Sequence, residues 1–134
     1  MNKIEAEVKE IQNSDAVHVV VFRAKNEELT MMALELPKGV KEGSKVTLGI
    51  KPSFVLIAKS KTKDISLTNQ IPALIISLDI GKLLVTVVLK SEVGVFESLI
   101  TKRSCDMMDL KVKQDVVVMM KASEISIVGV ESGV

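Results

Sequence analysis

Residues 2–6 read NKIEA, and residues 69–73, 67 positions later, read NQIPA, with Asn, Ile and Ala at matching places. Further along the chain the shift becomes 70 and pairs Lys51 with Lys121. Self-similarity at a fixed spacing is the signature of a repeated structural unit. The chain is therefore a tandem duplication, and everything below depends on what one copy folds into.

Each copy contains five short segments rich in β-branched residues, which favour strands; the chain holds 20 Val and 12 Ile. The predicted strands are residues 4–8, 17–22, 29–33, 45–50 and 54–57 in the first copy, and 71–78, 83–89, 95–100, 116–120 and 125–128 in the second. Five strands in about 60 residues predict a small barrel of the OB type. The predicted fold is all-β, with two tandem OB-like barrels over residues 1–60 and 61–134.

The second copy carries three extra residues, and they fall in residues 101–109. There we predict one short helix with Thr101 as its N-cap. The polar stretch 59–64 is the predicted linker between the copies.

Composition narrows the function classes. With 134 residues, the chain is too short for a Rossmann or (β/α)₈ enzyme body. Its net charge of +1 disfavours a role based on neutralising phosphates. Three Phe and no Trp or Tyr imply a small hydrophobic core, which predicts self-association.

The longest apolar run, residues 71–78, falls short of the roughly 20 residues of a membrane helix. The charged N-terminus and single Cys predict a cytoplasmic protein.

Residues for catalysis are sparse, so we predict a protein that is not an enzyme. His18 stands in a Val run without a second ligand type nearby, and we interpret it as an exposed or hydrogen-bonded strand histidine rather than a metal ligand. Cys105 follows Arg103 and Ser104, which would lower its thiol pKa at a helix start; the alternative is a partly buried small hydrophobe. The seven glycines are scattered and form no phosphate loop.

Two kinds of segment could hold an anion. Ser66, Leu67, Thr68 and Asn69 lead into the first predicted strand of the second copy and supply hydroxyls and backbone N–H groups. A plain linker with an Asn that caps a turn would look the same. Lys-x-Ser occurs at matching places before the last strand of each copy, as Lys51-Pro52-Ser53 and Lys121-Ala122-Ser123. A lysine with nearby donors suits a dianion, but an ordinary solvated turn is the alternative.

With these segments the chain resembles the molybdate-binding Mop family, also called molbindin or TOBE domains, in its two-copy form. The family's opening motif resembles Ser-Ala-Arg-Asn-Gln-Leu, which residues 66–71 match as SLTNQI, and its closing Lys-Ala/Ser-Ser/Thr is matched by residues 121–123. Residues 100–104 resemble the strand end and short helix between them. The resemblance implies OB-like barrels, strand-exchanging oligomers, and molybdate or tungstate bound at interfaces between copies or subunits.

Carried over by residue, the resemblance implies that Ser66 donates its hydroxyl and that Leu67 and Thr68 donate backbone N–H groups beside Asn69. Lys121, Ala122 and Ser123 would complete the shell, and Lys51, Pro52 and Ser53 would serve a second site. Three departures predict fewer sites or altered affinity. Thr68 stands where the family has Arg, Pro52 lacks an N–H, and nothing in the sequence corresponds to Ser-Ala-Arg before Asn2.

The first hypothesis is therefore intracellular storage of molybdate or tungstate by a homo-oligomer, a dimer, trimer or hexamer. The alternatives are the molybdate-sensing region of a transcriptional regulator, an accessory domain of a molybdate-uptake ATPase, or assembly without binding. A nucleic-acid-binding OB fold is disfavoured, because only Phe22, Phe54 and Phe96 could stack on bases and two of them lie in predicted core strands.

Overall fold

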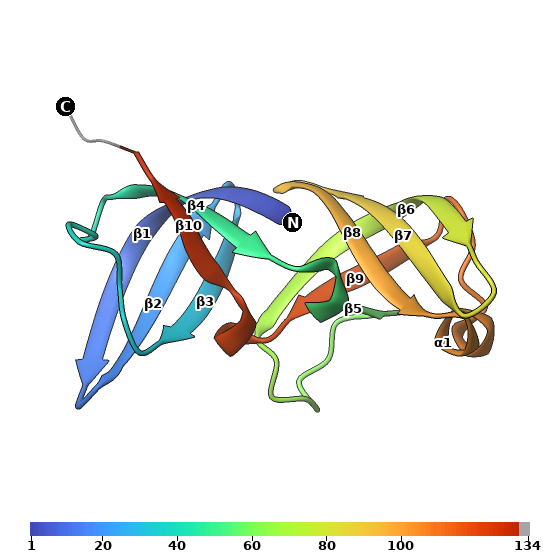
Figure 1. Ribbon diagram of the computed structural model, residues 1–134, viewed down its shortest axis with the longest axis horizontal. Helices are drawn as coiled ribbons and strands as arrows, with labels where there is room; N and C mark the ends of the chain where they lie inside the picture. Colours follow the sequence, from blue (N-terminus) through green and yellow to red (C-terminus); the bar gives the residue numbers. More distant parts are fainter. Residues whose placement is uncertain (132–134) are drawn as a thin grey trace.

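The computed structural model describes residues 1–131 and consists of two five-stranded antiparallel sheets placed end to end (Figure 1). The elements in chain order are β1 (Asn2–Ser14), β2 (Val17–Ala24), β3 (Glu27–Ala33), β4 (Lys45–Ile50), η1 (Pro52–Phe54), β5 (Val55–Ala58), β6 (Asn69–Ile80), β7 (Leu84–Ser91), β8 (Gly94–Thr101), α1 (Lys102–Met108), β9 (Asp115–Met120), η2 (Ala122–Glu124) and β10 (Ser126–Val130). All ten predicted strands are present, and the all-β, OB-like fold is confirmed.

The duplication is visible in the strand irregularities. The pairing of β1 with β2 shifts register between Val8 and Glu10, and the pairing of β6 with β7 shifts between Ile75 and Ser77. These bulges lie at equivalent places of the two copies, 67 residues apart. A β-bulge bends its strand and increases its twist. Each long first strand is therefore curved at the same point, which allows a small sheet to curl around its core.

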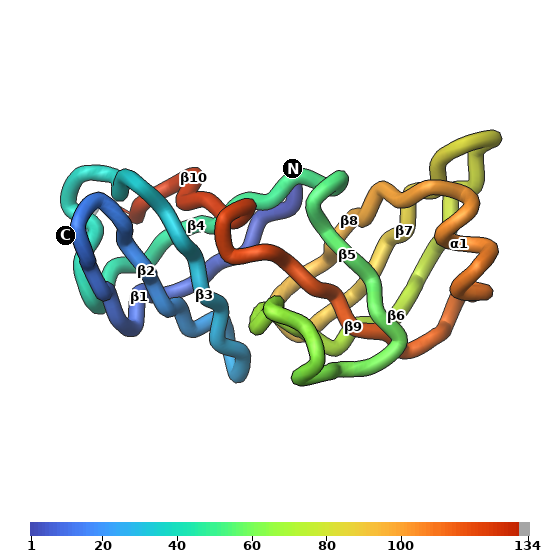
Figure 2. Tube along the Cα trace, turned by 90° about the horizontal axis from the view of Figure 1, so that it is seen from below, coloured from blue at the N-terminus to red at the C-terminus, as the bar shows by residue number. Residues whose placement is uncertain are grey.

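The last strand of each copy lies in the other copy's sheet. The first sheet has the order β10-β4-β1-β2-β3 and the second β5-β9-β6-β7-β8. Figures 1 and 2 show β10 running along β4 and β5 running along β9. We expected residues 54–57 and 125–128 to close their own copies, and this expectation was wrong. Both strands occupy matching repeat positions, so the repeat pattern does not indicate which sheet each strand joins. The division at residue 60 describes the sequence repeat, and the sheets do not follow it.

Two short crossovers carry the chain between the sheets. Residues 51–54 lead from β4 to β5, and residues 121–125 lead from β9 to β10. Each contains one 3₁₀ turn, closed by Phe54 N–H on the Lys51 carbonyl at 2.9 Å and by Glu124 N–H on the Lys121 carbonyl at 2.9 Å. Both Lys-x-Ser segments are thus the crossovers themselves, at the centre of the molecule (Figure 1).

The core is aliphatic around one buried aromatic in each copy. Phe22 is 0% exposed and Phe96 is 1% exposed, whereas Phe54 in η1 is 38% exposed. Strand β9 is buried on both of its faces from Val116 to Met120, and both of its edges are paired, with β5 and with β6. Two of the three phenylalanines are therefore unable to stack on bases, which removes the main support for nucleic-acid binding by an OB fold.

Helix α1 follows the prediction for the second copy. The hydroxyl of Thr101 accepts a hydrogen bond from the Ser104 N–H at 3.1 Å, which satisfies one of the free donors of the first turn. Asp109 ends the helix in the left-handed conformation, with φ of 51°. Among the described residues, no helix has the length and apolar character needed to cross a bilayer.

Gly49 makes room for the exchanged strand β10. A methyl group at this position would lie 2.7 Å from Val128 Cγ1 and 2.7 Å from Met1 Sδ. We expect Gly49→Ala to push β10 away from β4 and to lower the free energy of unfolding by about 1–3 kcal/mol, as measured by urea denaturation.

The matched control is Gly129→Ala, on β10 itself. Its added methyl would meet Thr47 Cβ at 3.6 Å, an ordinary contact. This variant should unfold close to the wild type, and equal destabilisation by both substitutions would contradict the steric explanation.

Candidate functional site

The two predicted donor segments of the second copy begin at neighbouring strand ends. Strand β6 starts at Asn69, β9 ends at Met120, and these two residues are antiparallel partners. Met120 is also the partner of Val55, the first residue of β5. Residues 66–68, which precede β6, therefore leave the same end of the second sheet as Lys121, which follows β9. The crossover that contains Lys51 arrives at this end too.

Asn69 links the two sheets with its side chain. Its Oδ1 accepts from the Thr30 N–H at 2.7 Å, and its Nδ2 donates to the carbonyls of Thr30 at 2.8 Å and Met120 at 3.0 Å. Asn69 is 1% exposed. Both amide hydrogens are used, so the side chain has no donor left for a ligand. The Asn69 side chain therefore links the two sheets, and a role for Asn69 in anion binding stays a prediction.

Asn2 makes the equivalent link in the opposite direction. Its Nδ2 donates to the Glu97 carbonyl at 2.9 Å, and its Oδ1 accepts from the Glu97 N–H at 2.7 Å. Thr30 and Glu97 are themselves 67 residues apart, as are Asn2 and Asn69. The sequence analysis did not identify this reciprocal bridge, although the repeat of Asn at the start of both copies was the available signal.

Several donors around this centre have no partner within the chain. No other group in residues 1–131 accepts a hydrogen bond from the backbone N–H of Ser66, Leu67 or Thr68. The N–H groups of Ala122 and Ser123 precede the first hydrogen bond of η2, so that turn does not use them. Together with the Lys121 ammonium, these groups form what we call the donor cluster: Ser66, Leu67, Thr68, Lys121, Ala122 and Ser123.

The first-copy crossover offers less. Lys51 and Ser53 are exposed, and Pro52 has no N–H to donate. Only the Ser53 N–H precedes the closing bond of η1, compared with two such groups in η2. The Met1 side chain, next to Asn2, lies close to Gly49. The expectation that this copy supplies a poorer shell stays a prediction.

A third feature, which the sequence analysis missed, is the loop of residues 59–68 between β5 and β6, which Gln70 holds with its side chain. We call it the Gln70 loop. Gln70 Oε1 accepts from the Thr62 N–H at 3.0 Å, and Gln70 Nε2 donates to the carbonyls of Thr62 at 2.9 Å and Leu67 at 2.6 Å. The loop encloses a hollow of about 520 Å³, lined by Lys61, Thr62, Lys63, Ile65, Leu67, Thr68 and Gln70. Two lysines of the linker thereby share one hollow with two members of the donor cluster.

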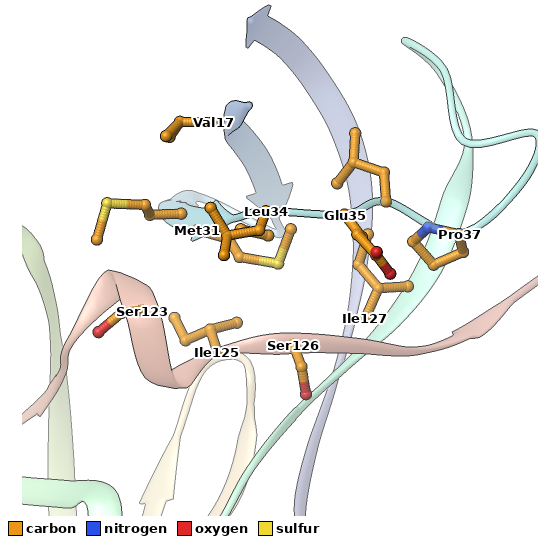
Figure 3. A pocket seen from close by; sticks show the side chains of 12 residues that line it. Val17, Met31, Leu34, Glu35, Pro37, Ser123, Ile125, Ser126 and Ile127 are labelled. Atoms are coloured by element: carbon orange, nitrogen blue, oxygen red, sulfur yellow. The ribbon is translucent and has the colours of Figure 1, made fainter. Parts of the chain in front are cut away.

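A second cavity, of about 740 Å³, is mainly apolar. It lies between the end of β3 and the η2–β10 segment, and Figure 3 shows Met31, Leu34, Ile125 and Ile127 around it. Ser123 is the only member of the donor cluster that lines it. The Ser126 side chain points away from Ile125, as strand alternation requires (Figure 3). An apolar cavity with one carboxylate, Glu35, at its edge is unsuited to an anion.

The two residues considered for other chemistry are engaged elsewhere. His18 lies on β2, and its Nδ1 is hydrogen-bonded to Asn13 Oδ1, as predicted for a satisfied strand histidine. Cys105 is 5% exposed inside α1, and burial, followed by the negative charge of Asp106, raises the pKa of its thiol. The interpretation of Cys105 as a small buried hydrophobic residue is therefore confirmed, and its interpretation as a thiol with a lowered pKa is wrong. In the described part of the chain, no three His, Cys, Asp or Glu side chains are grouped to hold a metal ion.

No family model and no curated protein matches the sequence. Among solved structures, the chain is similar to a crystal structure of the cytoplasmic molybdate-binding protein ModG, in a PEG-grown form with molybdate bound. The TM-score is 0.88 at 20% sequence identity, over 96% of this chain and 95% of that chain. A likeness at this identity establishes a shared fold along nearly the whole length of both chains.

The role of Asn69 predicts a large effect on stability. Asn69→Ala leaves Thr30 and Met120 without their side-chain partners in a buried place, and we expect the free energy of unfolding to fall by about 2 kcal/mol or more in urea denaturation. Asn26→Ala is the control, because Asn26 also joins the two copies, through Glu92, but at an exposed site. It should cost less than about 0.5 kcal/mol, and a similar loss in both variants would contradict the structural role of Asn69.

The burial and the raised pKa of Cys105 predict that its thiol reacts slowly with disulfide reagents. At pH 8 the native protein should hold less thiolate than the unfolded chain, so modification by a disulfide reagent should be much slower in buffer than in urea. Adding an exposed thiol through Ser60→Cys provides the control, which should react at the rate of a free thiol. Equally fast modification of native Cys105 would contradict its burial.

Proposed function

We propose that the protein binds a tetrahedral oxyanion, molybdate or tungstate, at the donor cluster and stores it in the cytoplasm without catalysing a reaction. The observation that carries the proposal is that two segments with free N–H groups, hydroxyls and one lysine adjoin the paired residues Asn69 and Met120. The shared fold with ModG, a protein described as molybdate-binding, supports it. No observation specifically supports the two alternatives, the molybdate-sensing region of a transcriptional regulator and an accessory domain of an uptake ATPase.

The chemistry of the cluster suits a dianion. Neutral N–H and O–H donors can each contact one ligand oxygen, and the Lys121 ammonium adds one full charge. Ser66–Thr68 and Lys121–Ser123 contain no carboxylate that would repel the ligand. Donors on a rigid sheet end cannot close around a smaller ion, so the size of the shell would separate molybdate from sulfate, which has the same charge and shape.

One chain leaves the cluster open. Ser66, Thr68, Lys121 and Ser123 are all exposed in the monomer. Removing a dianion from water is costly unless nearly every oxygen is hydrogen-bonded. We infer that a second copy of the chain covers the cluster and completes the shell, so that the working form is a homo-oligomer whose assembly is linked to ligand concentration.

Titration calorimetry with molybdate, tungstate and sulfate tests the proposal. We expect binding of the two larger anions, little heat from sulfate, and a loss of about 10-fold or more in affinity in Lys121→Ala, since a hydrogen bond to a charged group contributes about 1.5–3 kcal/mol. Lys38→Ala, an exposed lysine in a turn of the first copy, is the control for charge alone.

Native mass spectrometry with and without molybdate counts subunits and anions together. Bound anions should be found on oligomers and not on single chains. Wild-type protein that binds neither molybdate nor tungstate would refute the proposed function, and tight binding by a monomer would refute the need for a second copy.

A further inference from the structure

The Gln70 loop is fixed in place by one side chain. Gln70 is the second residue of β6, so its backbone is set by the sheet, and its amide holds Thr62 through both the N–H and the carbonyl. A further bond, from the Asp64 N–H to Thr62 Oγ1 at 3.0 Å, tightens the adjacent turn. The amide therefore joins Thr62 and Leu67, two residues within the loop of residues 59–68. A ten-residue connection that could have been a loose linker has a defined course next to the donor cluster.

This loop is rich in positive charge. Residues 59–68 contain Lys59, Lys61 and Lys63 against a single acid, Asp64. Within residues 1–131, the ion pairs are Lys9–Glu28, Arg23–Glu28, Lys102–Asp106 and Lys111–Asp109, so neither Lys61 nor Lys63 is neutralised by a neighbour. Two uncompensated ammonium groups line the same hollow as Leu67 and Thr68.

The donor cluster needs such charge. Residues 66–69 carry neutral donors only, and Lys121 supplies one positive charge against the two negative charges of a dianion. Opposite charges a few ångströms apart attract more strongly near a protein surface than in bulk water, because the effective dielectric constant is lower there. A cation beside Thr68 would add to the single positive charge of Lys121.

We propose that Lys61 and Lys63, positioned by Gln70, form a cationic wall of the oxyanion site and contribute to affinity for dianions. This inference rests on the proposed function of the donor cluster. The two lysines act directly on the anion, and Gln70 is a positioning residue that acts through the loop. The linker between the copies is accordingly part of the binding site and not only a connection.

The experiment compares three variants with matched controls by titration calorimetry with molybdate at low and high salt. Lys61→Ala/Lys63→Ala should weaken binding about 10-fold or more at low salt and less at high salt, because salt screens exposed charges. Lys38→Ala/Lys41→Ala removes the same charge from a turn of the first copy and should change affinity less than twofold. Lys61→Arg/Lys63→Arg should stay within about threefold of the wild type.

Gln70→Met keeps the side-chain volume while removing all three hydrogen bonds, and it should weaken binding several-fold although both lysines remain. Gln12→Met, at an exposed position of β1, is its control. If Lys61→Ala/Lys63→Ala binds molybdate with the affinity of the wild type, this inference is overturned and the proposed function still stands. Binding unchanged in Gln70→Met would overturn the positioning role, and a wild type that binds no oxyanion would overturn both proposals.

Discussion

The pairing of each sheet with the last strand of the other copy is the interaction on which the rest of the structure depends. Strand β4 pairs with β1 along one edge, and β10 pairs with its other edge. Strand β9 pairs with β6 along one edge, and β5 pairs with its other edge. An unpaired edge would expose a row of backbone donors and acceptors. The exchange also fixes where the crossovers run, and so brings both Lys-x-Ser segments to the centre of the molecule. The location of the two Lys-x-Ser segments is thus a consequence of the exchange of β5 and β10 between the sheets.

The two asparagines at the starts of β1 and β6 add specificity to this exchange. Each uses a primary amide to satisfy both the N–H and the carbonyl of one residue in the opposite sheet, Thr30 or Glu97. A buried amide with every hydrogen bond made rigidifies its surroundings, and the same amide unpaired would be costly. The docking of one copy on the other is therefore defined by geometry as well as by apolar burial.

Strand content, the short helix with its Thr101 cap, the buried Phe22 and Phe96 and the duplication could all be predicted from hydrophobic period and repeats. The partner of each last strand could not, because Val55 and Ile125 are equivalent in the repeat and a periodic pattern does not say which copy a strand joins. The sequence indicated residues 66–68 and 121–123 as candidate segments, but it did not indicate which of their N–H groups lack a partner. The Asn69 contacts to the other sheet and the Gln70 loop were missed, because a side-chain hydrogen bond leaves no hydrophobic period in the sequence.

Strand exchange within one chain also has a consequence for biosynthesis. Ile127 pairs with Leu48, 79 residues earlier in the sequence. The ribosome therefore releases β1 to β4 long before β10 exists, and the nascent first sheet must wait with the β4 edge open. Contacts between distant residues slow folding, and exposed strand edges invite pairing with other chains. For a protein built this way, the rate at which translation finishes is itself a factor in whether a chain closes on itself or on its neighbour.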